Sequence, residues 1–358
     1  MKPKNKFLLS YKKKRVLITG TTGFKGAWLS FWLNMLGAKV VGIALKPEKN
    51  SILFNTLKLE KKIKQYYFNI NEYKKLNLII KKEKPDIIFH LAAQSIVSES
   101  FDDPLTTMKT NIIGSVNILE SFRINNIPNL VYITSDKCYL NLDKSQSYRE
   151  TDRLGGIDNY SSSKASAELV FSSYFHSYFK KDKYLRLAST RAGNVIGGGD
   201  MKSNRIIPDI IKSFRKKTNL ALRNPNATRP WQHVLEPLSG YLLLGHNLIN
   251  KKLKTNLLPS WNFGPNLVNC KNVKHITKLV VDRLKSRSLK INIKRDKRFH
   301  EAKLLSLNIH KAKKELNWRP RLNLKQTINL TIDWYKSYFD NKDMVSFTKD
   351  QIKLFLKN

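Results

Sequence analysis

Short, almost continuous runs of apolar residues alternate with longer amphipathic stretches along the first half of the chain. The short runs have the length of strands that are buried on both faces of a sheet, and they cover 16–19, 39–45, 66–70, 86–92, 129–135 and 184–190. The stretches between them have the length of helices, and they cover 25–36, 72–82, 104–126 and 160–180. Because right-handed crossovers place such helices on both faces of a sheet, the pattern predicts an α/β domain with a doubly wound parallel sheet.

The pattern changes after Gly193. A glycine-rich turn at 197–199 is followed by amphipathic stretches of helical length at 206–217, 235–249, 271–286 and 324–340. These stretches predict a smaller mixed α/β domain that lies over the carboxyl edge of the sheet, where doubly wound sheets bind ligands. We therefore predict domains at 1–193 and 194–358, with segments that can interleave and a ligand site between them.

The charge balance raises a competing function, which is nucleic-acid binding. The chain of 358 residues has 66 Lys and Arg against 27 Asp and Glu, a formal net charge of +39. Counterion release gives such proteins affinity for polyanions. The lysines are spread along the whole chain instead of forming one basic arm. We therefore predict no specific nucleic-acid partner, only salt-sensitive sticking to polyanions.

The sequence predicts neither a membrane-spanning segment nor a metal site. No run approaches the roughly 18 apolar residues of a membrane helix, and the apolar run at 7–9 is too short for a signal-peptide core. Cys138 and Cys270 are too few for a disulfide framework or a zinc site of the usual ligand count. With 41% apolar residues the chain can bury a substantial core. We predict a cytoplasmic protein without membrane or metal contacts.

A glycine-rich turn joins the first predicted strand to the first predicted helix. Its glycines permit a tight turn, close approach of a pyrophosphate to the backbone and close packing of helix on strand, while the helix N-terminus faces the phosphates. This context predicts a dinucleotide site of the Rossmann type. The candidate cofactor contacts in the turn are Gly20, Thr22, Gly23, Phe24, Lys25 and Gly26.

The acid that usually holds the adenosine ribose after the second strand is missing. The strand ends at 43–47 without a carboxylate, and the segment after the third strand, 69–71, has none either. Lys46 could receive the 2′-phosphate of NADP, but in a chain this rich in lysine a chance lysine is the commoner explanation, so the residues leave NAD and NADP open. Without this pair of charge-assisted hydrogen bonds, worth roughly 1.5 to 3 kcal/mol each, we expect loose cofactor binding.

Tyr160 and Lys164 lie one helical turn apart. A cationic Lys164 is expected to lower the pKa of the Tyr160 phenol, so that Tyr160 can take a proton from a substrate hydroxyl while a nicotinamide accepts hydride. The spacing alone is weak, because Tyr338 and Lys342 share it. Tyr160 is distinguished by its place at the start of the helix that follows the fifth strand, at the carboxyl edge of the sheet.

Three consecutive polar residues, Ser135, Asp136 and Lys137, end the fifth strand. Their hydroxyl, carboxylate and amine are expected to point at the nicotinamide pocket. A simple alcohol dehydrogenase needs only the hydroxyl, so the added acid and base predict chemistry beyond oxidation. An Asp-Lys pair in a surface turn is the alternative, and the nearby Tyr160 and Lys164 weaken it.

These motifs, in this order, resemble the extended short-chain dehydrogenase/reductase superfamily of NAD-dependent epimerases and dehydratases, and within it the CDP-glucose 4,6-dehydratases. The resemblance runs from about Lys14 to Tyr338. Besides the segments above, it is carried by the stretches 89–94, 155–156, 191–200 and 223–237. The related dTDP-glucose dehydratases have Asp-Glu where this chain has Asp136 and Lys137, and sugar epimerases generally lack the acid-base pair.

The resemblance implies a substrate, a cofactor and further contacts. It implies CDP-glucose, NAD, a homodimer that pairs through the helices at 104–126 and 160–180, and a hydro-lyase of deoxysugar biosynthesis for lipopolysaccharide O-antigen. It extends the cofactor contacts to Leu91, Ala92, Ala93, Tyr160 and Lys164. The candidate substrate contacts are Gln94, Asn194, Arg205, Arg223, Arg229 and His233. Packing is the alternative role of His90 and His233, and surface positions are the alternative for Arg205 and Arg223.

The implied reaction has three steps. Tyr160, helped by Lys164 and Ser135, takes the C4 hydroxyl proton as hydride passes to NAD⁺. Lys137, which can accept a proton only in its neutral form, removes the C5 proton while Asp136 protonates the departing C6 hydroxyl. Hydride then returns to C6. Another nucleotide-sugar dehydratase or epimerase of the superfamily is the alternative.

Overall fold

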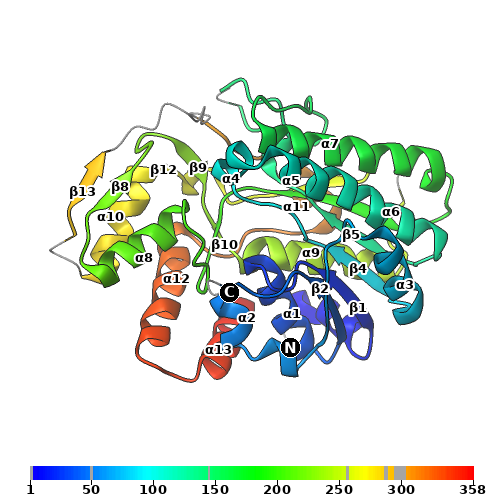
Figure 1. The fold of residues 1–358 in the computed structure, drawn as a ribbon, viewed down its shortest axis with the longest axis horizontal. Helices are drawn as coiled ribbons and strands as arrows, with labels where there is room; N and C mark the ends of the chain where they lie inside the picture. Colours follow the sequence, from blue (N-terminus) through cyan, green and yellow to red (C-terminus); the bar gives the residue numbers. More distant parts are fainter. Residues whose placement is uncertain (1–2, 49–50, 144–145, 255–257, 286–288, 294–303) are drawn as a thin grey trace.

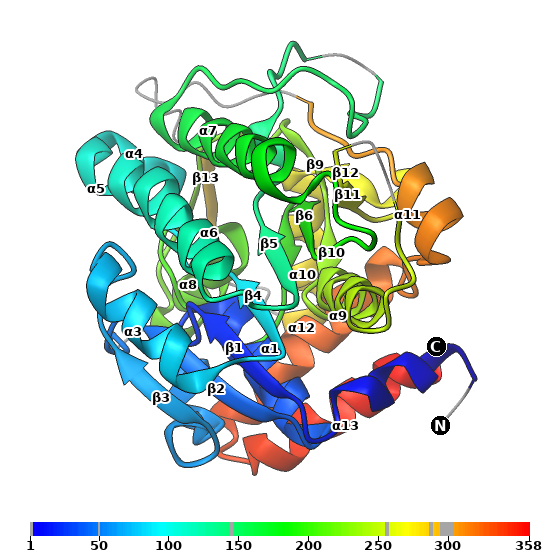
Figure 2. The ribbon, with the colours of Figure 1, turned by 90° about the vertical axis from the view of Figure 1, so that its right-hand side faces the viewer.

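A seven-stranded parallel sheet lies at the centre of the molecule (Figure 1 and Figure 2). The computed structural model describes residues 3–48, 51–143, 146–254, 258–285, 289–293 and 304–358. The strands are β1 (Arg15–Thr19), β2 (Lys39–Ala44), β3 (Lys64–Tyr67), β4 (Ile87–His90), β5 (Leu130–Ile133), β6 (Leu187–Ala192) and β11 (Ser260–Phe263). Their order is β11-β6-β5-β4-β1-β2-β3, and every neighbouring pair is parallel. This is the strand order of a doubly wound sheet, so the predicted fold class is confirmed.

Helices cover both faces of the sheet (Figure 2). The helices α3, α6 and α7 pack against one another on one face, and α1 and α9 pack together on the other. Their bounds are α1 (Phe24–Met35), α3 (Tyr73–Glu83), α6 (Gly114–Ile124), α7 (Asn159–Tyr174) and α9 (Leu235–Ile249). Every residue of β4 and β5 is buried. Coverage on both faces is the physical reason for the continuous apolar runs in the sequence.

Two predicted helices are interrupted by π-helical turns. The stretch 104–126 comprises α5 (Pro104–Met108), a π-turn (Lys109–Ile113) and α6. The stretch 160–180 comprises α7 and a π-turn (Phe175–Phe179). Two short helices, α2 (Ile52–Thr56) and α4 (Val97–Asp102), were not predicted, because five or six residues are too few to show a helical period.

Most strands end elsewhere than predicted: β2, β4 and β5 stop one or two residues early, and β3 and β6 also differ. Strand β3 stops at Tyr67, three residues short of the predicted end, because the chain then turns: the backbone N–H of Glu72 donates to the Asn69 carbonyl at 2.9 Å. Strand β6 continues to Ala192, beyond the predicted end at residue 190. Its polar residue Arg191 is fully buried, which the apolar pattern could not indicate.

The second half of the chain contributes to both parts of the molecule. Strand β11 extends the central sheet through its pairing with β6, and α9 packs on that sheet, so the segments interleave across residue 193. Strand β11 was not predicted, because its four residues lack the continuous apolar run by which the other strands were identified. The remaining segments form a smaller lobe, seen at the left of Figure 1, that comprises α8 (Ile206–Lys216), β8 (Leu220–Leu222), β9 (Thr228–Pro230), β12 (Cys270–Asn272), α10 (Val273–Leu284) and β13 (Ile291–Ile293).

The two ends of the chain lie side by side (Figure 2). The Asn5 side chain donates to the Leu356 carbonyl at 2.8 Å, and the rings of Trp32 and Phe355 meet edge to face at 6.0 Å. The C-terminal helices are α11 (His310–Leu316), α12 (Leu324–Phe339) and α13 (Met344–Lys357), and a 3-10 helix (Pro3–Tyr11) opens the chain. Three short ladders complete the fold: β7 (Val195–Ile196) with β10 (Gln232–His233), β12 with β9, and β13 with β8. Helix α13 was not predicted.

No helix within the described ranges is both long and apolar enough to cross a membrane. The predicted cytoplasmic location stays a prediction.

Candidate active site

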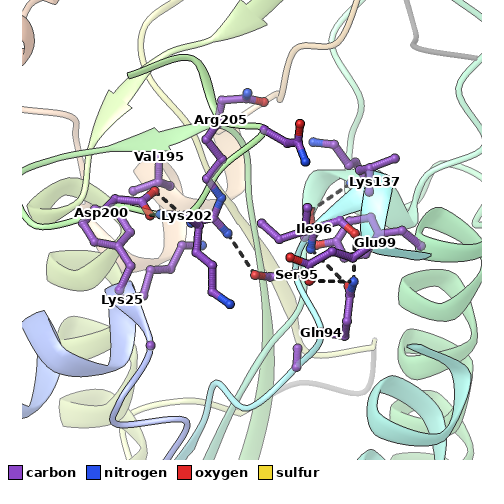
Figure 3. Close-up of a pocket in the computed structure, with 18 of the residues that line it drawn as sticks. Lys25, Gln94, Ser95, Ile96, Glu99, Lys137, Val195, Asp200, Lys202 and Arg205 are labelled. Atoms are coloured by element: carbon purple, nitrogen blue, oxygen red, sulfur yellow. Dashed lines mark hydrogen bonds and ion pairs between the residues drawn. The ribbon is translucent and has the colours of Figure 1, made fainter. Parts of the chain in front are cut away.

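A cleft of about 1260 Å³ lies between the carboxyl edge of the sheet and the smaller lobe. Its walls are the loops that follow β1, β2, β4 and β5, the start of α7, and α8, β8 and β9 of the lobe. Figure 3 shows side chains from both walls pointing into this space. The cleft therefore occupies the place that the sequence predicted for the ligand site.

The glycine-rich turn after β1 needs its glycines for two separate reasons. Gly20 has a φ of +80°, and a Cβ there would lie 2.9 Å from the backbone nitrogen of Ala92. A Cβ on Gly26 would lie 2.0 Å from the Gly20 carbonyl oxygen. Since no side chain caps α1 at Gly23, the first N–H groups of this 12-residue helix face the cleft without a side-chain acceptor. This arrangement fits a bound dinucleotide diphosphate.

All the predicted cofactor contacts line the cleft. The glycine-rich turn supplies one part of this set, and the loop after β4 supplies another. This loop is held to β1 because the buried Thr19 hydroxyl accepts the backbone N–H groups of Leu91 and Ala92 at 3.1 Å. Burial lowers the pKa of Lys25 to about 8. The residues concerned are Gly20, Thr22, Gly23, Phe24, Lys25, Gly26, Leu91, Ala92, Ala93, Tyr160 and Lys164.

The end of β2 carries no carboxylate, as the sequence indicated. Leu45 and Lys46 line the cleft there. A carboxylate follows slightly later, at Glu48, and it accepts Lys202 Nζ at 2.8 Å in an ion pair between the β2 loop and the loop before α8. Sequence analysis missed Glu48, because an acid after Pro47 falls outside the usual position.

The turn after β5 gathers the predicted hydroxyl, acid and base. Asp136–Cys138 form a 3-10 turn that Ser135 caps by accepting the Lys137 backbone N–H. The fully buried Asp136 receives hydrogen bonds on Oδ1 from the Ser135 hydroxyl at 3.0 Å and from Lys137 Nζ at 3.3 Å. Its Oδ2 atom is buried without a hydrogen-bond partner among the described residues. The carboxylate therefore has one oxygen free in a cleft wall, and the surface-turn alternative does not apply to it.

The first turn of α7 brings Tyr160 to the same place. Asp158 caps this helix by accepting the Ser161 N–H at 2.9 Å, and Lys164 Nζ lies 5.9 Å from the centre of the Tyr160 ring. Burial raises the pKa of Tyr160 to about 12, with a smaller opposite effect from a hydrogen bond to Ser135. Burial also lowers the pKa of Lys164 to about 8. The expected net lowering of the Tyr160 pKa was wrong, because burial outweighs the hydrogen bond to Ser135 and the positive charge of Arg205.

A buried ion pair supports these residues from beneath. Arg191 Nη2 on β6 donates to Glu168 Oε2 on α7 at 2.8 Å, and neither side chain exposes more than 1% of its surface. Glu168 also accepts the hydroxyls of Thr134, which precedes Ser135, and of Ser189. The pair therefore connects the end of β5 to α7 and β6. Sequence analysis missed it, and the only signal was the position of Glu168 one turn after Lys164.

We call Ser135, Asp136, Lys137, Tyr160 and Lys164 the sheet end of the cleft. The second-lobe end consists of Asn194, Arg205, Asp209, Arg223 and Arg229.

Arginines dominate the second-lobe end. Arg205 Nη1 donates to Asp200 Oδ2 at 2.8 Å, and its Nη2 reaches across the cleft to the Ser95 hydroxyl at 2.9 Å (Figure 3). Arg229 is buried on β9 and donates to the Thr228 carbonyl at 2.9 Å. Arg223 donates to a backbone carbonyl at 3.0 Å. Planar guanidinium groups in such an arrangement suit a diphosphate, which they can bind through two hydrogen bonds each.

Of the remaining predicted substrate contacts, two line the cleft and one does not. Gln94 and Asn194 line the cleft, and the Asn194 Oδ1 atom is buried without a hydrogen-bond partner among the described residues. His233 does not line it: the ring is fully buried 6.1 Å from the Trp28 ring, and its Nδ1 accepts the Leu235 N–H at 3.3 Å. Burial lowers the pKa of His233 to about 3. His90 is likewise buried, 2.8 Å from the Thr19 hydroxyl, so both histidines have the packing environment given as their alternative.

Comparisons with known proteins agree with this geometry. A family model described as GDP-mannose 4,6 dehydratase matches residues 17–331. The CDP-glucose 4,6-dehydratase of Salmonella typhimurium is 40% identical over 351 residues, 97% of each chain. The UDP-glucose 4-epimerase of Mycoplasma genitalium is 25% identical over 353 residues, 92% of this chain and 98% of the other.

Solved structures share the fold. The dTDP-glucose 4,6-dehydratase of Bacillus anthracis, solved in complex with NAD, superposes with a TM-score of 0.77 at 22% identity and covers 93% of this chain and 99% of its own. An epimerase of Methanothermobacter thermautotrophicus superposes with a TM-score of 0.79 at 21% identity, covering 94% of this chain and 96% of its own.

Proposed function

The chain belongs to the GDP-mannose 4,6 dehydratase family of nucleotide-sugar enzymes, and on that premise we propose that it is a CDP-glucose 4,6-dehydratase. It converts CDP-glucose to water and CDP-4-dehydro-6-deoxyglucose. The sugar nucleotide is a precursor for deoxysugars such as those of O-antigen. The observation that carries the proposal is the 40% identity to the Salmonella enzyme over 97% of the chain. The acid, base and tyrosine gathered at the sheet end support it.

NAD is the proposed cofactor, and when bound it takes hydride from C4 of the sugar and later returns it to C6. The backbone cradle at Gly20 and Gly26 and the N-terminus of α1 hold its diphosphate. Leu91 and Ala92, fixed by Thr19, form the opposite wall. Lys25 lies beside the cradle and adds positive charge to it.

Tyr160 is the proposed base for the C4 hydroxyl. Because burial raises its pKa to about 12, the phenol carries its proton at neutral pH, and the bound substrate and cofactor would have to stabilise its ionised form. Ser135 and the positive charge of Arg205 both act in that direction. Lys164, held on the same helix face, positions the phenol and its proton.

Asp136 and Lys137 are the proposed acid and base of the elimination. The reaction needs a neutral amine at Lys137 and a protonated Asp136, and their 3.3 Å hydrogen bond offers a route between the two forms. A proton shift along this bond converts the ion pair into the neutral pair. Lys137 then takes the C5 proton while Asp136 gives its proton to the C6 hydroxyl, which leaves as water. The original ion pair is regenerated, so the protons balance.

The second-lobe end is the proposed site of the CDP diphosphate. Arg229 and Arg205 supply fixed guanidinium groups, and Asp200 orients Arg205 through its 2.8 Å ion pair. Asn194 offers an unpartnered amide oxygen on the side nearest the sheet. With the diphosphate on these contacts, the glucose would lie between the arginines and Tyr160.

The direct test is turnover. Purified protein incubated with CDP-glucose and NAD⁺ is expected to form a keto-deoxy sugar, detected by its absorbance after treatment with alkali. Formation of only a C4 epimer would instead support an epimerase, the activity named for the Mycoplasma relative. Turnover of another nucleotide sugar but not of CDP-glucose would contradict the proposed substrate.

A homodimer is proposed for the working enzyme. Large apolar side chains on α5, α7 and their π-turns are exposed: Leu105 by 63%, Ile113 by 50%, Leu169 by 59% and Tyr178 by 54%. Pairing through these helices would remove this apolar surface from water. Light scattering at moderate salt is expected to give twice the chain mass, and a monomer would contradict the proposal.

Loose cofactor binding is proposed as well. The end of β2 has no carboxylate for the ribose, and the nearby Glu48 is engaged by Lys202. Activity after extensive dialysis is expected to depend on added NAD⁺. Protein that remains saturated with NAD after dialysis would contradict this expectation.

A further inference from the structure

One carboxylate at the second-lobe end differs from every other carboxylate that lines the cleft. Five of the six accept a hydrogen bond from a side chain, and they are Glu48, Glu99, Asp136, Asp158 and Asp200. The sixth is Asp209, in the first turn of α8, which is half-buried and forms no ion pair with any described residue. In a chain with 66 cationic side chains against 27 acidic ones, an unpaired cleft carboxylate is unusual.

The cations near Asp209 are directed elsewhere. Lys212 Nζ donates to the Ser203 hydroxyl at 2.8 Å, and Arg223 Nη2 donates to the Asn204 carbonyl at 3.0 Å. Among the residues that the structure describes, Asp209 receives only a backbone hydrogen bond from Asn204. Burial raises the pKa of Asp209, and these nearby cations oppose the effect only in part. An acceptor thus remains at this end of the cleft for a ligand donor.

The order of the groups along the cleft indicates which part of a ligand reaches Asp209, and this inference rests on the proposed function. Tyr160 and Lys137 fix the sugar at the sheet end, and the arginines fix the diphosphate beyond it. The space past the diphosphate is walled by α8 and by β8 and the loop that follows it. That space is left for the nucleobase.

A carboxylate can read the base because ionised Asp only accepts hydrogen bonds. Cytosine presents an amino donor at position 4, whereas thymine presents a carbonyl acceptor there, and uracil shares that carbonyl. The uncharged amide side chains of the loop after β8, Asn224 and Asn226, carry both a donor and an acceptor and so fit either base. The Asp209 carboxylate, by contrast, favours the amino group and repels the carbonyl.

We propose that Asp209 is a specificity-determining residue that selects cytidine nucleotides over uridine and thymidine nucleotides by accepting the 4-amino group of the base. A hydrogen bond to a charged acceptor changes affinity by about 10- to 100-fold. Asp209 therefore decides which nucleotide binds without taking part in the chemistry on the sugar.

Binding of free CDP and UDP tests this directly. Isothermal titration of the full-length protein is expected to give at least about tenfold tighter binding of CDP than of UDP. In Asp209→Asn the amide can turn its NH₂ group toward the uracil carbonyl, so the ratio of the two affinities is expected to fall by about tenfold or more. The matched control Asp282→Asn makes the same charge change on the exposed surface of α10, outside the cleft, and is expected to keep the wild-type ratio.

The outcomes separate this inference from the proposed function. An unchanged ratio in a folded Asp209→Asn, or equal binding of CDP and UDP by the wild type, overturns the role of Asp209 even if CDP-glucose is turned over. A ratio that collapses only in Asp209→Asn supports that role even if CDP-glucose is not converted, in which case only the proposed reaction fails. The ratio of CDP to UDP affinity in the wild-type protein can contradict the proposal without any variant. If Asp209→Asn does not fold, Asp209→Ser provides a second, smaller replacement.

Discussion

The two ends of the cleft are built from different kinds of elements. At the sheet end, the proposed catalytic side chains follow a central strand or open a 16-residue helix, and the buried pair of Glu168 and Arg191 lies beneath them. At the second-lobe end, the arginines lie on a three-residue strand and in loops; Arg223 and Arg229 donate to backbone carbonyls, and Arg205 donates to side chains. The proposed proton-transfer groups are thus fixed by long core elements, whereas the proposed diphosphate-binding groups lie on short segments of the lobe.

The largest expected effect comes from removing the proposed bases of the sheet end. Tyr160→Phe is expected to lower turnover by about 10²- to 10⁴-fold, because general base catalysis contributes that much. Lys137→Met is expected to lower overall turnover similarly but at a later step. Single-turnover absorbance of the reduced nicotinamide distinguishes the two: it should appear and persist with Lys137→Met and stay absent with Tyr160→Phe.

The same experiment can contradict the assigned roles. If folded Lys137→Met binds cofactor but forms as little reduced nicotinamide as Tyr160→Phe, Lys137 acts in oxidation or positioning and not in elimination. Lys353→Met, an exposed replacement on α13, serves as the control for loss of a lysine.

Breaking the buried pair tests whether the core holds the sheet end. Glu168→Gln leaves Arg191 charged and unpaired in the interior, so the free energy of unfolding is expected to fall by about 3 to 5 kcal/mol. Urea denaturation measures this change. Glu72→Gln is the matched control, because its pair with Lys75 is half exposed and should contribute less than about 1 kcal/mol. Equal effects of the two replacements would mean that the buried pair does not anchor this end.

A pH dependence is expected from Glu236, which joins α9 to the segment before α12. Its carboxyl is 1% exposed and accepts the N–H groups of Arg321 and Leu322 at 2.8 and 2.7 Å. Burial raises the pKa of Glu236 from 4.5 to about 7. The folded protein therefore keeps this proton while the unfolded chain loses it, so the stabilising contribution is complete below pH 4.5 and is lost as the pH rises through about 7.

Between pH 4.5 and about 7, the free energy of unfolding is expected to fall by about 3 kcal/mol, because each pKa unit corresponds to roughly 1.4 kcal/mol. Urea unfolding at intervals between pH 5 and 8 measures it. Glu236→Gln resembles the protonated acid and is expected to remove this part of the decline. A variant whose stability falls with pH as steeply as the wild type would contradict the raised pKa.

The smallest effect is expected where the two walls meet at the surface. Lys202→Ala removes the ion pair with Glu48, whose side chain is 62% exposed, and should change the free energy of unfolding by less than about 1 kcal/mol. Thermal unfolding at low and high salt measures the change. A loss of several kcal/mol would show that this contact holds the lobe against the sheet, and the contrast between the two ends would then be weaker.

Local sequence determined much of the sheet end. A strand buried on both faces must be continuously apolar, so the run of polar residues that follows it, which includes Ser135 and Asp136, marks its carboxyl end. Glycines at 20 and 26 mark a turn that only small residues can form. Because the carboxyl ends of parallel strands share one edge, the order of these motifs was enough to predict that they face one cleft.

The rest was decided by contacts between distant segments. The pairing of β11 with β6, the burial of Arg191 against Glu168, and the exclusion of His233 from the cleft depend on residues that lie far apart in the chain. The raised pKa of Tyr160 has the same origin, because burial is a property of everything packed around a group and not of its neighbours in sequence. Asp209 was passed over for this reason too: its sequence context is an ordinary first turn of a helix, and only the folded lobe leaves its carboxylate unpaired beside the cleft.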